Sequence, residues 1–271
     1  MTGQKIIKWF GIFLAIFLII NIISGISMAV FTFFEGIDFF NNSQTSVLDT
    51  NKELEINEEI TALNIDLSIT KLIIQEGTSF KVETNNDSLI NYQKNNTLYI
   101  KEESGNWFQK YKNLELVITL PNDFLFTNVS INMGAGSVFL ESLKTNYLDL
   151  EMGAGKVTIN NLEVSDECFL NGGAGSMEIL DGIINNLDLD VGVGKFSLTS
   201  LLTGNNKIDA GVGELNLNIL NQKADYKIEV NKGIGSILID SVSIFDGEIV
   251  GNGSNTIYVD GGVGKIDIKF H

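Results

Sequence analysis

The stretch that decides the fold is Met152-Gly153-Ala154-Gly155-Lys156-Val157-Thr158-Ile159, because variants of it recur through the second half of the chain. The successive Gly-x-Gly triplets begin at Gly134, Gly153, Gly173, Gly192, Gly211, Gly233 and Gly262, so the steps between them are 19, 20, 19, 19, 22 and 29 residues. A nearly fixed period of this length is typical of an array of stacked structural units.

Apolar residues alternate on both sides of each triplet. Leu148, Leu150 and Met152 come before the second triplet, and Val157 and Ile159 follow it with the phase shifted by one. Alternation indicates a strand with one buried face, and the shift indicates a bend at a glycine, which has no Cβ. Nineteen residues are too few for a strand, a helix and a parallel strand, which need about 30.

We therefore predict an all-β fold, a single-stranded right-handed parallel β-helix (β-solenoid) with about 19–20 residues per coil. Leu63–Ile74 matches the pattern with Ser68-Ile69-Thr70 at its corner and is the predicted first coil. The C-terminal Lys265–Lys269 is expected to be an edge strand, where charges hinder pairing with another chain. The middle residues of the triplets are expected to stack inward as one buried column: Ala135, Ala154, Ala174, Val193, Val212, Ile234 and Val263.

Residues 9–34 are almost entirely apolar and predict one transmembrane helix. Lys5 and Lys8 precede this run, so the N-terminus is expected in the cytoplasm. The predicted organisation is a cytoplasmic N-terminus (1–8), a membrane helix (9–34), a juxtamembrane linker (35–57) and an extracytoplasmic domain (58–271). A cleaved signal peptide ending near Ser27-Met28-Ala29 is the alternative, although the apolar cores of such peptides span only about 7–15 residues.

Composition excludes some classes of function. The 271-residue chain has a formal net charge of −16, which argues against nucleic-acid binding because phosphates would be repelled. Cys168 is the single cysteine, which excludes an intrachain disulfide and a cysteine-cluster metal site. Cys168 falls on the inward parity of its coil and is predicted to be a buried thiol.

Two groups of residues are candidates for binding. An outward column of acidic and amide residues precedes the corners: Asp66, Asn132, Glu151, Asn171, Asp190, Asp209 and Asp260. Within it Glu151, Asp190 and Asp209 could face a cation or a cationic partner; the alternatives are a solvated face or a catalytic groove. Trp107, Phe108 and Tyr111 lie in segment 102–112, which is either a partner-binding loop or a lid over the end of the solenoid.

The known motifs for metal and cofactor binding are not matched. In a calcium-binding Gly-Gly-x-Gly-x-Asp repeat, the aspartate position would fall on Met177 or Ile266, both of which are expected in the core. No Gly-Lys-Ser/Thr phosphate loop is present. We expect no enzyme activity, no cofactor and no catalytic residues.

The chain resembles a bacterial family of putative adhesins, which are membrane-linked domains of Gly-rich β-strand repeats. The residues that carry the resemblance are the strand Leu116–Leu120 ending in Pro121, then Val129–Val138 and its repeats, over roughly residues 60–270. The resemblance implies a right-handed β-helix behind a transmembrane segment in the bacterial envelope, and it brings no catalytic residues.

We therefore expect a single-pass protein of the bacterial cell membrane whose extracytoplasmic β-solenoid is an interaction, adhesin-like or structural module without catalysis. Its expected partners are the membrane and an unidentified protein or cell-surface partner, with no nucleic acid. The alternatives are an accessory regulator of an envelope-stress sensing system and an enzyme acting on cell-wall glycan.

Overall fold

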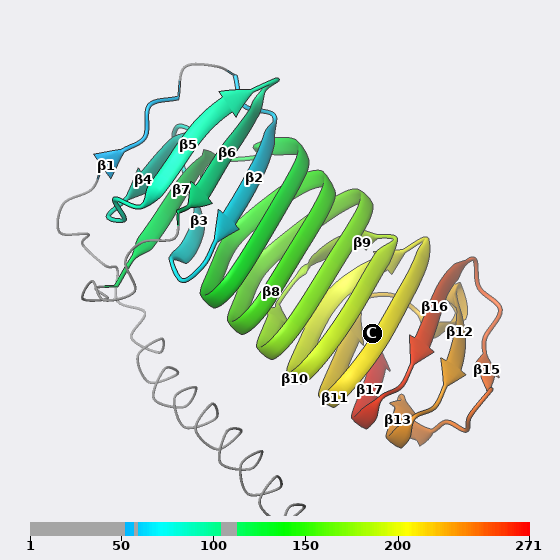
Figure 1. Cartoon of the computed structure of the whole chain (residues 1–271). Coiled ribbons are helices and arrows are strands. Elements are labelled where there is room, and N and C mark those ends of the chain that lie inside the picture. The colour runs from blue at the N-terminus through cyan, green and yellow to red at the C-terminus, as the bar shows by residue number, and fades with distance from the viewer. Residues whose placement is uncertain (1–51, 57–58, 104–112) are drawn as a thin grey trace, which may run out of the picture. The chain divides into compact units, whose positions relative to one another are not determined.

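The structure of the chain is a computed structural model that describes residues 52–56, 59–103 and 113–271 (Figure 1). Two predictions fall outside these residues: the membrane helix 9–34, and the aromatic segment with Trp107, Phe108 and Tyr111. Within the described residues no helix is long and apolar enough to cross a membrane.

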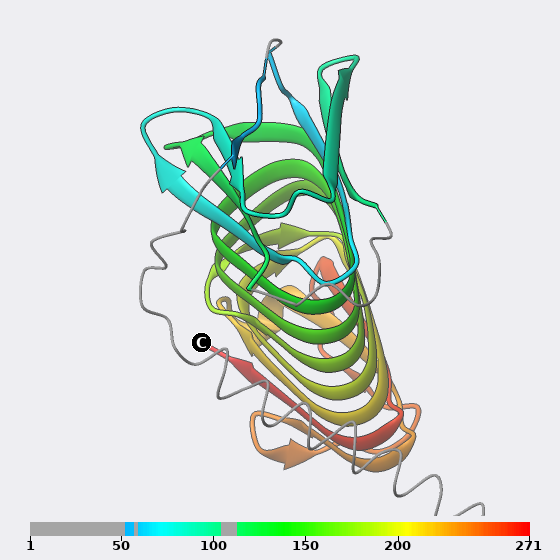
Figure 2. The same cartoon turned by 60° about the vertical axis from the view of Figure 1, so that its left-hand side comes forward.

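The described chain winds into a solenoid of parallel coils (Figures 1 and 2). The central coils run through β8 (Leu125–Ile179), β9 (Gly182–Asn185), β10 (Leu187–Thr203) and β11 (Asn205–Ile219). Leu187 pairs in parallel with Cys168, and Asp188 pairs with Lys207, so each of these steps is one coil of 19 residues. The predicted parallel β-solenoid and its period are confirmed; its right-handed winding stays a prediction.

The core fills the inside of the coils. Inward residues such as Leu150, Leu189 and Phe196 are buried, as the alternation predicted. Cys168 is fully buried, which confirms the prediction of a buried thiol, and burial raises the pKa of this thiol.

The predicted inward column of middle residues is wrong, because these side chains point outward. Val193 is 58% exposed, Val212 49%, Val263 48% and Ile234 76%, and the three alanines are exposed as well. The reason is the backbone at the second glycine of each triplet, where φ lies between +135° and +149°. The chain turns there, and the alternation of inward and outward positions does not continue through the corner.

Only glycine fits at these positions of the stacked corners. A Cβ on Gly155 would lie 1.9 Å from the carbonyl oxygen of Gly136, and a Cβ on Gly153 would lie 2.4 Å from that of Gly134. Neighbouring coils therefore touch backbone to backbone at the corner, where a side chain has no room.

At the N-terminal end of the solenoid, the coils do not stack in the order in which they occur in the sequence. β2 (Ala62–Leu67) and β3 (Lys71–Gly77) form the predicted first coil, with its corner at residues 68–70. β6 (Thr97–Glu102) and β7 (Glu115–Pro121) pair on the outer side of that coil and form the terminal one. Antiparallel strands then cover its edge, namely β4 (Lys81–Thr84) on β7, β5 (Leu89–Lys94) on β6 and β1 (Lys52–Glu53) on β4.

The C-terminal end repeats this arrangement. After β11 and the 3₁₀ turn η1 (Lys223–Asp225), the chain forms an outer coil from β12 (Tyr226–Asn231) and β13 (Ile234–Ile239). The chain passes through β14 (Val242–Ser243) and β15 (Ile249–Val250), which pair antiparallel with β13 and β12. It then returns as β16 (Asn255–Asp260) and β17 (Val263–Phe270), which lie between β11 and the outer coil.

The expectation that Lys265–Lys269 forms an edge strand is therefore wrong, because β17 pairs on both sides. Val263 pairs with Val212 on one side and with Ile234 on the other. The long steps of 22 and 29 residues supply the chain that forms the outer coil, covers its edge and comes back.

Candidate interaction surface

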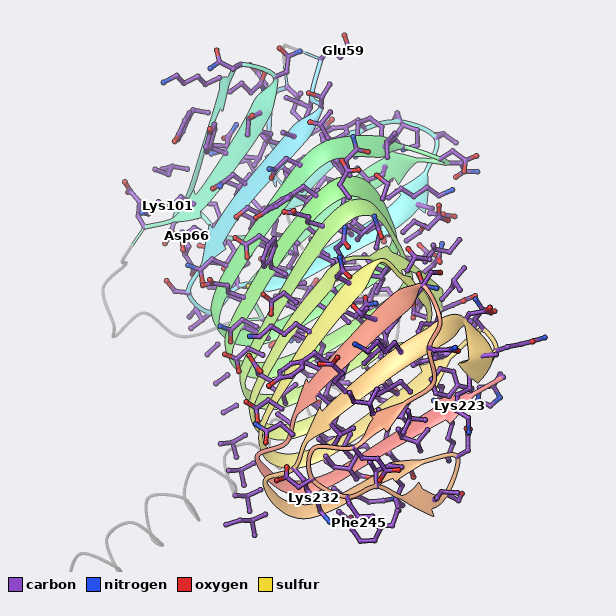
Figure 3. The ribbon with its side chains drawn as sticks, turned by 90° about the vertical axis from the view of Figure 1, so that its right-hand side faces the viewer. Glu59, Asp66, Lys101, Lys223, Lys232 and Phe245 are labelled. Carbon is purple, nitrogen blue, oxygen red and sulfur yellow. The ribbon has the colours of Figure 1, made fainter. Side chains whose placement is uncertain are left out.

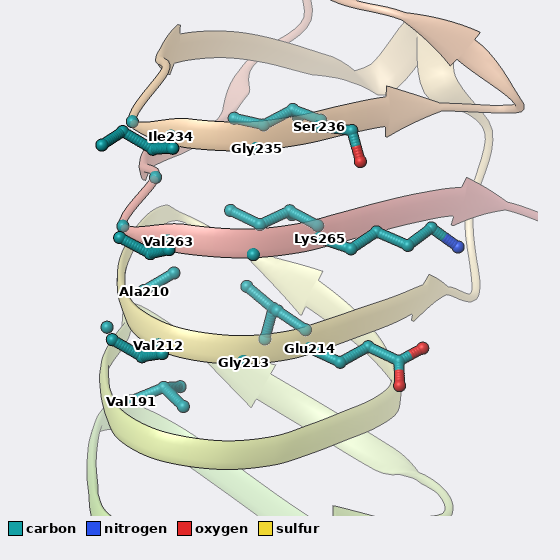
Figure 4. A pocket seen from close by; sticks show the side chains of 18 of the residues that line it. Val191, Ala210, Val212, Gly213, Glu214, Ile234, Gly235, Ser236, Val263 and Lys265 are labelled. Atoms are coloured by element: carbon teal, nitrogen blue, oxygen red, sulfur yellow. The ribbon is translucent and has the colours of Figure 1, made fainter.

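An exposed apolar ridge runs along one edge of the solenoid. We call it the corner ridge; it is formed by the middle residues of the stacked corners. Figure 4 shows Val212, Val263 and Ile234 stacked one above the other at this edge. The register places Val193 between Ala174 and Val212, and Val263 between Val212 and Ile234. In spatial order the corner ridge contains Ile69, Ala135, Ala154, Ala174, Val193, Val212, Val263 and Ile234.

The side chains of the corner ridge become larger toward the C-terminal end. Three alanines follow Ile69, then three valines, then Ile234, which is the most exposed member. Apart from Ile69 at its N-terminal end, the ridge is therefore narrow in its first half and bulky in its second half.

The predicted acidic and amide column lies on one side of the ridge, and we call it the acidic flank. Asp66 pairs with Asn132, Asp190 pairs with Asn171 and Asp209, and Asp209 also pairs with Asp260, which pairs with Asn231. The predicted stacking is confirmed for these pairs. Of the three candidate residues, Asp190 and Asp209 are direct neighbours, whereas Glu151 lies in a coil farther along β8.

Lysines and amides offset some of the charge on the acidic flank. Lys101 Nζ lies 3.4 Å from an Asp66 carboxylate oxygen on the same side of the solenoid (Figure 3), and Lys207 forms an ion pair with Asp209. Asn231 Nδ2 donates to Asp260 Oδ1 at 3.2 Å. The described residues contain no group of three or more acidic, histidine or cysteine side chains placed to hold a metal ion.

A second column lies on the other side of the ridge, and we call it the lysine flank. Each member comes three residues after the first residue of its corner: Lys71, Ser137, Lys156, Ser176, Lys195, Glu214, Lys265 and Ser236. Glu214 pairs in register with Lys195 and Lys265, and its carboxylate lies 3.6 Å from Lys195 Nζ. A hydrogen bond from Asn216 and the nearby Lys195 hold the pKa of Glu214 below its usual range.

A hollow lies behind the ridge at the C-terminal corners (Figure 4). Core residues Val191 and Ala210 and the corner glycines line it, and the space open to a water-sized sphere is about 20 Å³. That is room for about one water, far less than a small-molecule ligand needs. The hollow is therefore not a site for a small molecule, and the exposed feature at these corners is the ridge itself.

The buried carboxylate of Glu102 lies against the first corner of the ridge, at residues 68–70. Glu102 Oε2 accepts hydrogen bonds from the backbone N–H groups of Ser68 at 2.7 Å, Ile69 at 3.0 Å and Thr70 at 3.3 Å. Asn86 Nδ2 donates to Glu102 Oε1 at 3.2 Å and to Thr70 Oγ1 at 2.7 Å. This carboxylate satisfies donors at the first corner of the ridge, and its role is structural.

The family model described as Toastrack DUF4097 matches residues 50–245. The chain belongs to the Toastrack DUF4097 family. No curated protein matches the chain significantly.

Two solved structures are similar to this Toastrack chain. One is a putative cell adhesion protein from Clostridium sporogenes, 20% identical, which covers 82% of this chain and 99% of its own, with a TM-score of 0.33. The other is a putative adhesin from Bacteroides fragilis, 13% identical, which covers 82% of this chain and 97% of its own, with a TM-score of 0.48.

The sequence alone did not reveal the corner ridge of this Toastrack domain. The sequence does contain a signal for it. A residue between two glycines, neither of which has room for a Cβ, lies on a sharp bend and points outward. The lysine flank also has a signal in the sequence, because Lys71 and Lys265 both follow a corner directly. The role of Glu102 could not be identified, since the backbone donors that it accepts from lie 32–34 residues earlier in the chain and Asn86 lies 16 residues earlier.

Proposed function

We propose that the chain is a membrane-anchored interaction module of the bacterial cell envelope, adhesin-like or structural and without catalytic activity. Residues 9–34 are the proposed anchor, and residues 58–271 form the proposed extracytoplasmic domain. The corner ridge is the proposed contact surface.

This proposal rests on the unbroken row of exposed apolar side chains along the corner ridge. Soluble monomers rarely expose contiguous apolar surface unless it binds something. Here apolar side chains are exposed at every described corner, from Ile69 to Ile234, while charged columns lie on both sides. Membership of the Toastrack family supports an interaction module.

Site-specific photo-crosslinking tests the contact surface. A photoreactive amino acid is placed at Val212 in the full chain, expressed in cells of the native host. The matched control carries it at Ile183, which is 51% exposed but lies on another side of the solenoid. We expect light-dependent protein adducts at position 212 and none at position 183. An adduct at position 212 supports the proposal whether it forms with another protein or with a second copy of the chain. The absence of any adduct at both positions would refute it.

Cysteine labelling tests the anchor and its orientation. Cys168 is buried and should give little background with a membrane-impermeant maleimide. In intact cells a cysteine at the exposed Ser254 should be labelled, and one at Thr2 should be labelled only after the cells are opened. Labelling of Thr2→Cys in intact cells would show the opposite orientation, and loss of the chain from washed membranes would contradict an uncleaved anchor.

A further inference from the structure

The charges on the two flanks of the corner ridge are correlated coil by coil. At four corners an acid precedes the ridge residue and a lysine follows it: Asp66 and Lys71, Glu151 and Lys156, Asp190 and Lys195, Asp260 and Lys265. At three others an asparagine precedes and a serine follows: Asn132 and Ser137, Asn171 and Ser176, Asn231 and Ser236. No lysine follows an asparagine at these seven corners, and the eighth, with Asp209 and Glu214, has an acid on both flanks.

Ion pairs within one chain do not account for this correlation. None of the ion pairs among the described residues joins an acid to the lysine of its own corner; Lys71 pairs with Glu115, Lys195 with Glu214 and Lys265 with Asp267. The side chains of Glu151 and Lys156 have no hydrogen bond or ion pair with any described residue. Each acid and its lysine lie on opposite sides of an exposed apolar residue, where a second surface could meet both.

We propose that two copies of the chain associate along their corner ridges as a parallel, in-register homodimer whose two-fold axis runs along the ridge. Rotation about such an axis leaves the height along the solenoid unchanged and exchanges the two flanks. The acidic flank of one copy then faces the lysine flank of the other at the same coil. At the four acid–lysine corners each acid then meets a lysine, and at the three asparagine–serine corners each asparagine faces the position of a serine, of which Ser137 is buried.

The opposite orientation does not have this property. A two-fold axis across the ridge would place the acidic flanks of both copies against each other, and like charges would repel. The parallel arrangement also keeps both β2 strands at the same end of the dimer. Two chains anchored in one membrane need this, and in this respect the inference rests on the proposed function.

The dimensions of the ridge suit such an interface. Eight described coils at about 4.8 Å spacing make the ridge about 34 Å long. A standard interface buries about 800 Å² on each partner, which requires a strip about 24 Å wide. The contact must therefore include the outward residues of both flanks as well as the ridge.

The corner at Ala154 offers the best match. Its small side chain lets two ridges approach closely there, so Glu151 of one copy and Lys156 of the other can meet. Both groups are unpaired within the described part of their own chain. At the one corner that departs from the pattern, with Asp209 and Glu214, each carboxylate already has a lysine in its own chain, Lys207 and Lys195 respectively.

Single-cysteine cross-linking of the full chain in membranes tests the geometry. A residue on the axis meets its own copy, so Ala154→Cys and Val263→Cys should each give a disulfide-linked dimer on mild oxidation. Ile183→Cys, which lies away from the ridge, is the matched control and should stay monomeric. In an antiparallel pair Ala154 would instead meet Val212, and Ala154→Cys would link to Val212→Cys on a differently tagged copy. That result, or no linkage at either ridge position, would overturn the proposal.

Charge exchange tests the pairing, with Val263→Cys as a distant reporter. Glu151→Lys or Lys156→Glu alone should lower the dimer equilibrium constant roughly five-fold, because each puts like charges at two symmetry-related contacts. Co-expression of the two variants should restore the linkage, since a mixed dimer is again complementary. If neither variant lowers it, or if the mixture stays as weak as the single variants, the proposed charge pairing between copies is wrong.

The outcome also separates this inference from the proposed function. If position 212 forms photo-adducts with a different protein and ridge cysteines do not link two copies, the dimer is overturned while the interaction surface stands. If position 212 forms no protein adducts at all, both proposals fail.

Discussion

Replacing Gly175 with alanine should destabilise the solenoid by about 2–6 kcal/mol. Gly175 has a φ of +139°, a region nearly closed to residues with a Cβ, which costs about 1–3 kcal/mol. The added Cβ would also lie 1.9 Å from the carbonyl oxygen of Gly155, so two coils would have to separate. Overpacking of this kind costs about a further 1–3 kcal/mol.

The matched control is Gly172→Ala in the same coil. Gly172 has no positive φ, and a Cβ there would have its nearest neighbour 3.9 Å away. This variant should keep its stability or gain up to about 1 kcal/mol. Urea unfolding of the full chain in detergent, followed by far-ultraviolet circular dichroism, compares the two variants. Equal midpoints for Gly175→Ala and the unchanged chain would refute the idea that stacked glycines constrain the corner.

Three further predictions concern buried and charged groups. Glu102→Gln should lower the free energy of unfolding by roughly 1–2 kcal/mol because hydrogen bonds to a charged acceptor are stronger, whereas Glu103→Gln at an exposed position should leave it unchanged. Cys168 should react with a maleimide only when the chain unfolds, because the thiol is buried and its raised pKa disfavours the thiolate; rapid labelling of the folded chain would contradict its placement. Lys195→Met should raise the pKa of Glu214 toward its usual range in an NMR titration. Since the folded pKa of Glu214 is depressed, its stabilising contribution is present above the unfolded pKa and is lost as pH falls through the folded value; an unchanged titration would refute the role of Lys195.

Much of the fold could be predicted because the period and the alternation report directly on stacking and burial. The 19-residue coil, the buried inward residues such as Leu189, the buried Cys168 and the stacking of Asp190 on Asp209 all follow from these two patterns. The direction of Val193 could not be found by counting, because the glycine that follows it turns the backbone through a positive φ. Alternation alone therefore places the residues of the corner ridge in the core, where the structure does not have them.

The order of the coils at the two ends could not be predicted for a different reason. The corner pattern is the same in every repeat, so it does not specify the order in which the repeats stack. Gly211-Val212-Gly213 could accept either of the two later triplets as its neighbour, and the structure places the more distant one there. The chain reaches this order by its long return through β14 and β15, and the length of that return does not by itself specify a path.

The reversed order at both ends has a consequence for how such a protein can change in length. At each end of the solenoid the outer coil, β6–β7 or β12–β13, is nearer in sequence to the central coils than the coil it covers, β2–β3 or β16–β17. Repeats added in chain order would therefore not extend the stack. Repeats can instead be gained or lost in the middle, between β8 and β11, where one nineteen-residue unit replaces another without disturbing either closure. During synthesis, β16 and β17 leave the ribosome after β12 and β13. The edge of β11 therefore stays unpaired until β16 and β17 pair with it and the outer coil can take its final place.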